Sequence, residues 1–256
     1  MSKNRTLMAG LLLSLTSITT EASLTVGYAD GKSVVYSSLG NITWTGDANL
    51  LGTLQNKLGY EVVVNSIIAV SPVIIDMPNI FDTPANSGKH TVSSLDFDSN
   101  RLGAVSWFGA KAFINYLNST AYAGSSQWGL PITPPSNDQT GNFEQTSSQL
   151  GELFYKELGG TAGNPIPKTS YFSNEQDWVY WSDTQDPYAN DLAYNFITSN
   201  GVFSKYYKDF PLYAWAVSPG NLTSVPLPGA AWLFSAWIGL MALSMRYKPK
   251  ASIIIH

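Results

Sequence analysis

Short segments in which apolar and polar residues alternate open the central part of the chain, and a period of two predicts β-strands. The strands expected here are Leu24–Tyr28, Ser33–Tyr36 and Ile42–Trp44. The pairs Asp30-Gly31 and Gly40-Asn41 between them are typical of tight turns. The next apolar stretches, Tyr60–Val64 and Ile67–Ile75, fit either a helix or a strand, and prolines indicate that residues 76–100 are irregular.

Apolar residues spaced three and four apart predict two amphipathic helices farther along the chain. The first covers Trp107–Leu117, with Ser106 as its N-cap, and the second runs from about Ser147 to Leu158, where two glycines stop it. The later strands expected from aromatic and apolar runs are Trp178–Trp181, Leu192–Ile197 and Tyr213–Val217. Two helices beside several short strands indicate one α+β domain over residues 23–224.

The first 22 residues have the pattern of a secretory signal peptide. Lys3 and Arg5 precede an apolar run over residues 7–15, and small residues surround a cleavage position near Ala22. The apolar run is too short to span a bilayer comfortably. We therefore expect residues 1–22 to direct export and then to be removed.

Residues 225–250 have the pattern of a second membrane address. The tetrapeptide Val225, Pro226, Leu227 and Pro228 precedes seventeen uncharged residues (229–245), and Arg246, Lys248 and Lys250 follow. At the helical rise this stretch is about 25 Å long, just short of the roughly 30 Å hydrocarbon core. Cations at its end would stay cytoplasmic under the positive-inside rule, so both ends predict that the central domain lies outside the inner membrane.

This order of tetrapeptide, apolar helix and basic cluster resembles the PEP-CTERM sorting signal of Gram-negative bacteria, in its Val-Pro-Leu-Pro variant. The resemblance implies that an exosortase recognises the tetrapeptide and releases or transfers the protein, so that the C-terminal helix anchors it only transiently. Leu227 stands where the family name has Glu. A plain single-pass anchor that is never cut is the alternative.

Composition narrows the chemistry available to the domain. There is no cysteine, and the two histidines are His90 and His256, so disulfides, a thiolate nucleophile and a histidine metal cluster are excluded. Residues 23–224 contain 9 Lys and Arg against 17 Asp and Glu, a net charge of -8. An acidic domain repels phosphate backbones, so we expect no nucleic-acid partner.

Several segments of the domain resemble a bacterial family of unknown function that is named for the C-terminal domain of the collagen-like adhesin Lcl. The segments include Ile42-Thr-Trp44-x-x-Asp47-Ala48-Asn49, Gln127-Trp-Gly-Leu-Pro131, Phe172-Ser-Asn174, Val179-Tyr-Trp-Ser182 and Tyr213-Ala-Trp-Ala-Val-x-Pro-Gly220. The resemblance covers most of residues 33–220 and implies a C-type-lectin-like α+β fold that binds polysaccharide at the cell surface. Gly129 replaces an Arg of the family pattern, which together with the negative charge argues against a strongly sulfated ligand.

Two groups of residues are candidates for ligand binding. The loop containing Asp183, Asp186, Asn190 and Asp191 concentrates the hard oxygen donors that calcium prefers, although the same residue types also build ordinary solvated turns. No other metal or cofactor is expected. Tyr206 and Tyr207, between Lys205 and Lys208, are the aromatic cluster most typical of an exposed surface and are candidates for stacking on sugars, with core packing as the alternative.

The sequence predicts no catalytic residues. Glu152 and Glu157 are five apart on the second helix and therefore lie on different faces of an α-helix, and His90 has no nucleophile-elbow context. The leading hypothesis is a non-enzymatic surface or matrix protein that binds extracellular polysaccharide in adhesion or in biofilm or floc formation. The alternatives are a secreted glycan-active hydrolase and a structural coat protein with no small ligand.

Overall fold

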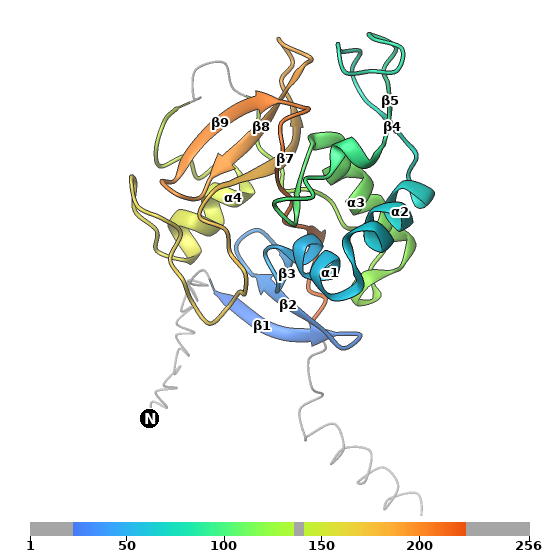
Figure 1. Ribbon diagram of the computed structural model, residues 1–256. Helices are drawn as coiled ribbons and strands as arrows, with labels where there is room; N and C mark the ends of the chain where they lie inside the picture. Colours follow the sequence, from blue (N-terminus) through green and yellow to red (C-terminus); the bar gives the residue numbers. More distant parts are fainter. Residues whose placement is uncertain (1–22, 136–140, 224–256) are drawn as a thin grey trace, which may run out of the picture.

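The computed structural model describes residues 23–135 and 141–223 (Figure 1). The first three strands of this part of the chain belong to a four-stranded antiparallel sheet. Its strands, in spatial order, are β1 (Leu24–Ala29), β2 (Lys32–Ser37), β3 (Ile42–Thr45) and β11 (Val217–Pro219). Asp30 and Gly31 join β1 to β2 with φ of 47° and 70°. Positive φ at both positions suits the twist of a two-residue hairpin, so the first three predicted strands and their turns are confirmed.

A second sheet of five strands lies beside the first. In spatial order its strands are β6 (Ala104–Val105), β10 (Leu212–Tyr213), β7 (Val179–Gln185), β8 (Leu192–Ile197) and β9 (Val202–Tyr207). β10 pairs with β7 in parallel and the other pairs are antiparallel. β7 and β8 confirm predicted strands, whereas β9 was not predicted.

Helices α1 (Leu50–Leu58), α2 (Tyr60–Val70) and α3 (Trp107–Ser119) gather on the side of the molecule away from β8 and β9 (Figure 1). α3 confirms the prediction, and the Ser106 hydroxyl caps it by accepting from the Gly109 N–H at 3.0 Å. α1 was missed, although Asn49 caps it in the same way. The ambiguous segment resolves into α2 followed by a short strand, β4 (Val73–Ile75).

The second predicted helix is shorter and less regular than expected. α4 (Gln149–Glu152) continues into one π-helical turn, η3 (Leu153–Glu157), which the Leu158 N–H closes by donating to the Leu153 carbonyl. The remaining elements are β5 (Lys89–Thr91), which pairs with β4, and two 3₁₀ turns, η1 (Ser94–Asp96) and η2 (Tyr122–Gly124). Residues 76–100 were predicted to be irregular: 76–88 are, whereas β5 and η1 form within the rest.

The predicted strand Tyr213–Val217 is wrong, because this segment leaves one sheet and enters the other. β10 ends at Tyr213 and β11 begins at Val217. Ala214, Trp215 and Ala216 between them are all buried, without the alternation that a single strand would show. The Trp215 indole N–H donates to the Thr45 carbonyl at 3.0 Å, which fixes the crossing segment to β3.

The core consists of two clusters of buried apolar side chains. One lies among α1, α2, α3 and one side of the five-stranded sheet, with Trp107, Phe108 and Phe113 near its centre. The other joins the two sheets and α4 around Trp44 and Trp215, whose ring centroids are 5.2 Å apart. The described residues thus form a mixed α/β fold with four α-helices, none of them long and apolar enough to cross a membrane.

Candidate functional site

The loop predicted to bind calcium uses two of its carboxylates for ion pairs within the protein. Asp183 pairs with Lys111 of α3. Asp186, only 3% exposed, pairs with Lys205 of β9 at 2.8 Å, and its other oxygen accepts from the Tyr188 N–H at 3.0 Å. Both carboxylates therefore fasten the end of β7 to neighbouring elements.

The other two candidate residues hold the irregular loop 76–88. The Asn190 side-chain amide donates to the Pro78 carbonyl at 2.9 Å, and Asp191 accepts from the Ile80 N–H at 3.0 Å. Each of the four candidates therefore has a different partner. Across residues 23–135 and 141–223, no group of three or more His, Asp or Glu side chains is placed to hold a metal ion.

This donor arrangement does not fit calcium. A cation at Asp183 or Asp186 would have to displace a lysine ammonium from the carboxylate that now binds it. Calcium needs six to eight oxygen ligands converging at about 2.3–2.6 Å. The segment from Asp183 to Asp191 instead holds β7, β9 and the loop 76–88 together.

The two predicted sugar-stacking tyrosines lie at an exposed aromatic surface at the end of β9. Tyr206, Tyr207 and Phe210 are 36%, 57% and 42% exposed. The Tyr206 ring stacks on Phe210 with centroids 5.2 Å apart, and Tyr207 meets Phe81 edge to face at 6.4 Å. We call these four residues the aromatic ridge. Since consecutive strand residues point to opposite faces, the ridge borders β9 on both sides.

A buried ion pair lies directly behind the ridge. Lys208 was expected to be exposed beside the tyrosines, but it is fully buried and its ammonium lies 2.6 Å from Asp76. It also donates to Gln185 at 2.6 Å and lies 5.1 Å from the centroid of the Trp107 ring. Burial lowers the pKa of Lys208 and raises the pKa of Asp76, so the cost of removing both charges from water opposes their attraction.

His90 lies in a second polar cluster on the other side of the loop 76–88. Its Nδ1 is 2.7 Å from the Phe81 carbonyl, and its Nε2 is 3.0 Å from the Asp96 carboxylate. Both partners are acceptors, so the imidazolium form of His90, in which both ring nitrogens donate, satisfies both contacts. Burial lowers the pKa of His90, but the bonds to Asp96 and Phe81 and the charges of Asp96 and Asp76 outweigh it and raise the pKa overall.

The His90 cluster lacks the arrangement of a catalytic triad. The Ser106 hydroxyl donates to Asp96 at 2.5 Å rather than to the histidine, and it caps α3 at the same time. A serine activated for attack would donate to the imidazole. The cluster instead joins the loop 76–88 to the start of α3.

Glu152 ends α4, and Glu157 ends the π-helical turn η3 that follows it. Glu157 accepts from the Ser37 hydroxyl at 2.8 Å, and its pKa is raised by burial and by the nearby charge of Glu152. Glu152 is also 3.5 Å from Lys156. Each carboxylate therefore has its own partner, Ser37 for Glu157 and Lys156 for Glu152, beside the turn between β2 and β3.

The sequence interpretation missed Phe81, Phe210 and the Asp76–Lys208 pair. A signal for the loop was present, because Asp76, Asn79 and Asp82 follow a spacing of three and bind one another. Nothing in the sequence marks Asp76 as the partner of Lys208, which lies 132 residues away. The full aromatic ridge and the ion pair beside it could therefore be identified only from the tertiary structure.

The predicted membrane addresses lie outside the described residues. They are the signal peptide (1–22), the tetrapeptide Val225, Pro226, Leu227 and Pro228, the apolar stretch after it, and the cations Arg246, Lys248 and Lys250. Their predicted roles stay predictions.

Comparisons with protein-family models, with curated proteins and with solved structures found no match for this chain.

Proposed function

We propose that this protein is an exported, non-enzymatic surface or matrix protein whose described domain binds extracellular polysaccharide. The observation that carries the proposal is the aromatic ridge, in which Tyr206 and Phe210 stack on one side of β9 and Tyr207 lies on the other, with between 36% and 57% of each residue exposed. Aromatic faces left in water on a folded domain mark interaction surfaces, and tyrosine offers both a ring face for stacking and a hydroxyl for hydrogen bonds. Sugars present the matching combination of C–H faces and hydroxyl groups.

The position of the ridge supports the predicted export route. Residues 23 and 223, where the described domain begins and ends, both lie at the four-stranded sheet, and Thr223 lies against Gly27 of β1. β9 ends on the opposite side of the molecule (Figure 1). While the predicted C-terminal helix still anchors the chain next to the sheet, the ridge would face away from the membrane and towards extracellular material.

The finer parts of the proposal concern family and processing. The domain belongs, in this proposal, to the C-type-lectin-like family named for the Lcl C-terminal domain, and an exosortase acts on the tetrapeptide at Val225 before the protein reaches the cell surface or matrix. Two sheets joined through β10 and β11, with helices on one side, are compatible with that fold. The proposal does not include calcium, because Lys111 and Lys205 already pair with Asp183 and Asp186, two of the three candidate carboxylates.

Binding of the full-length protein to a panel of exopolysaccharides tests the proposal, with Tyr207→Ala as the first variant. Truncating an aromatic residue at the centre of an interface typically costs about 2 kcal/mol or more, so we expect at least about tenfold weaker binding. Tyr28→Ala is the matched control, because Tyr28 is 64% exposed and lies on β1, in the other sheet from β9 (Figure 1). Isothermal titration with calcium and with a chelator should give equal affinities.

Three results would contradict the proposal. They are no binding to any polysaccharide, including that of the producing cell; an equal loss in Tyr28→Ala; and release of reducing sugar ends by the protein, which would favour the hydrolase.

A further inference from the structure

An open hollow of about 420 Å³, whose lining includes several side-chain amides, lies between the start of α1 and the segment that precedes β7. Its volume is within the range of about 300–1,000 Å³ that is usual for small-ligand sites. Asn49, Thr53 and Asn56 line it from α1 and its cap, and Asn174 and Gln176 line it from the other side, with Leu102 as the apolar part. None of these residues belongs to the aromatic ridge.

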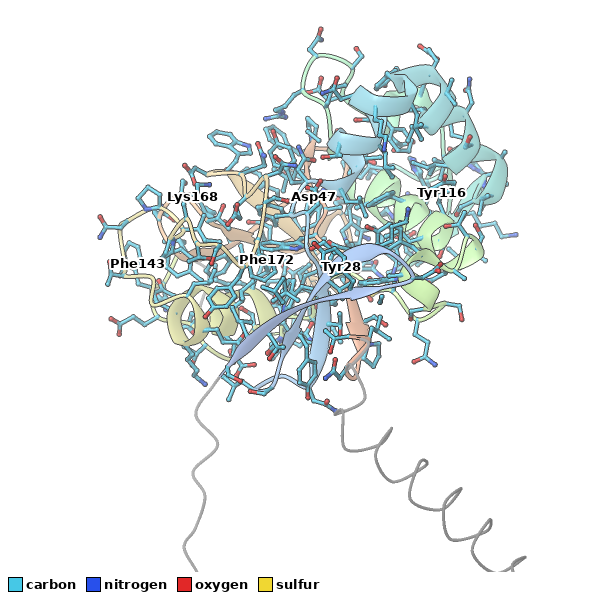
Figure 2. All side chains as sticks on the ribbon, turned by 90° about the horizontal axis from the view of Figure 1, so that it is seen from below. Tyr28, Asp47, Tyr116, Phe143, Lys168 and Phe172 are labelled. Atoms are coloured by element: carbon cyan, nitrogen blue, oxygen red, sulfur yellow. The ribbon has the colours of Figure 1, made fainter. Side chains whose placement is uncertain are left out.

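The walls of the hollow are fixed by Asp47, on the turn before α1 (Figure 2). Its carboxylate accepts from the Thr53 hydroxyl at 2.6 Å, from the Asn49 N–H at 2.9 Å and from the Asn174 amide at 3.0 Å. The backbone of Ser173 also bridges Gly46 and Ala48. Two segments 127 residues apart are thus held together before any ligand arrives, which lowers the entropic cost of binding.

Several polar groups at the hollow have no partner within the described part of the chain. The side-chain amide of Asn56 makes no hydrogen bond there, and the side-chain carbonyl oxygens of Asn174 and Gln176 accept none. An amide offers both donors and acceptors, as a sugar hydroxyl does. The lining contains no charged side chain, and three donors satisfy the Asp47 carboxylate behind it. Glu175, between two lining residues, has a buried Oε1 without a hydrogen-bond partner among the described residues, and this negative charge also disfavours an anionic ligand.

We propose that this hollow is a second glycan subsite, which binds an uncharged sugar unit through side-chain amides. This inference rests on the proposed function for the class of ligand. It adds an amide-lined subsite that is separate from the aromatic ridge. Neutral lining favours neutral hexose or pentose units over sulfated or uronic ones, since a charged group would be desolvated there without a counter-ion. Two subsites on one chain would let a long polysaccharide bind at both, with affinity raised by effective concentration.

The test compares the wild-type full-length protein with Asn56→Ala/Gln176→Ala by isothermal titration. The probes are uncharged hexasaccharides of glucose, mannose, galactose and xylose, with a sulfated chondroitin hexasaccharide for comparison. We expect the double variant to bind an uncharged probe at least about tenfold more weakly, because it loses two hydrogen bonds to a neutral ligand. Asn65→Ala is the matched control, because Asn65 is an exposed asparagine on α2 outside the hollow.

The outcomes separate this inference from the proposed function. If Tyr207→Ala weakens binding of an uncharged probe and the hollow variant binds as tightly as wild type, the subsite is overturned and the polysaccharide proposal stands. If wild type binds only the sulfated probe, the neutral subsite is overturned while glycan binding is retained. If wild type binds none of the probes at millimolar concentration, the neutral subsite is overturned, and the polysaccharide proposal fails with it only if the exopolysaccharide panel also shows no binding. Thermal unfolding of each variant shows whether a loss of binding reflects a loss of fold.

Discussion

His90 shows how one residue links the loop 76–88 to the helix behind it. Its ring stacks on Phe108 with centroids 3.7 Å apart, and its two nitrogens donate to Phe81 and Asp96. Phe81 belongs to the aromatic ridge, so His90 helps to position one of the ridge's residues through the Phe81 carbonyl. Deprotonation would remove one of the two donors, because a neutral imidazole has a single N–H.

The stability of the fold should therefore depend on the charge of His90. Its pKa is raised in the folded state, so its stabilising contribution is fully present below the ordinary pKa of about 6.5 and is lost as the pH rises through the raised value. We expect His90→Gln to lower the free energy of unfolding at about pH 6, and the difference from wild type to shrink at alkaline pH. Urea unfolding at several pH values measures this, and a difference that grows with pH would contradict it.

At the scale of elements, the Asp76–Lys208 pair connects the end of β4 to the end of β9. Both side chains are fully buried, and one oxygen of Asp76 has no hydrogen-bond partner within the described residues. Breaking a buried ion pair leaves the remaining charge unpaired and typically costs about 3–5 kcal/mol, whereas replacing both partners with apolar residues is often close to neutral. The pair is thus expected to specify where the loop 76–88 lies more than to stabilise the whole fold.

Lys208→Met should therefore lower the free energy of unfolding by about 3–5 kcal/mol, and Asp76→Leu/Lys208→Met should recover most of that loss. Lys168→Met is the control. Lys168 pairs with Asp177 at the surface, where each side chain is about half exposed, and such pairs contribute about 0–1 kcal/mol. Chemical denaturation gives all three values. The interpretation fails if Lys208→Met unfolds within about 1 kcal/mol of wild type, or if the double variant is no more stable than the single one.

The sequence predicted the elements whose conformation is determined by residues close together in the chain. The β1–β2 hairpin follows from Asp30-Gly31, and α3 follows from its apolar spacing and from Ser106. The segment around Trp215 could not be predicted in this way, because its burial between two sheets decides its conformation. The same holds for the candidate site. The exposure of Tyr206 and Tyr207 was predicted. The lysine partners of Asp183 and Asp186 were not, because they come from elements distant in the sequence.

At the scale of the whole molecule, residues 212–219 make the two sheets depend on each other. β10 lies between β6 and β7 in the five-stranded sheet, and a few residues later β11 pairs with β3 in the other. Trp215 between them contacts Trp44, Phe172 and Tyr180, which come from both sheets and from a connecting loop. Neither sheet can complete its hydrogen bonds while this segment is unfolded, so the described residues should unfold as one cooperative unit.

Fluorotryptophan labels at Trp44 in the four-stranded sheet and Trp181 in the five-stranded sheet can report the two halves separately, with resonances assigned from Trp44→Phe and Trp181→Phe. We expect both ¹⁹F signals to change at the same urea concentration. Trp215→Ala should lower both midpoints together and reduce the free energy of unfolding by about 3–5 kcal/mol, the usual cost of truncating a buried tryptophan. Trp178→Ala should have a much smaller effect, because Trp178 is 47% exposed. Separate midpoints for Trp44 and Trp181 would show that each sheet is stable alone, and the crossing segment would then be a linker rather than a shared part of both cores.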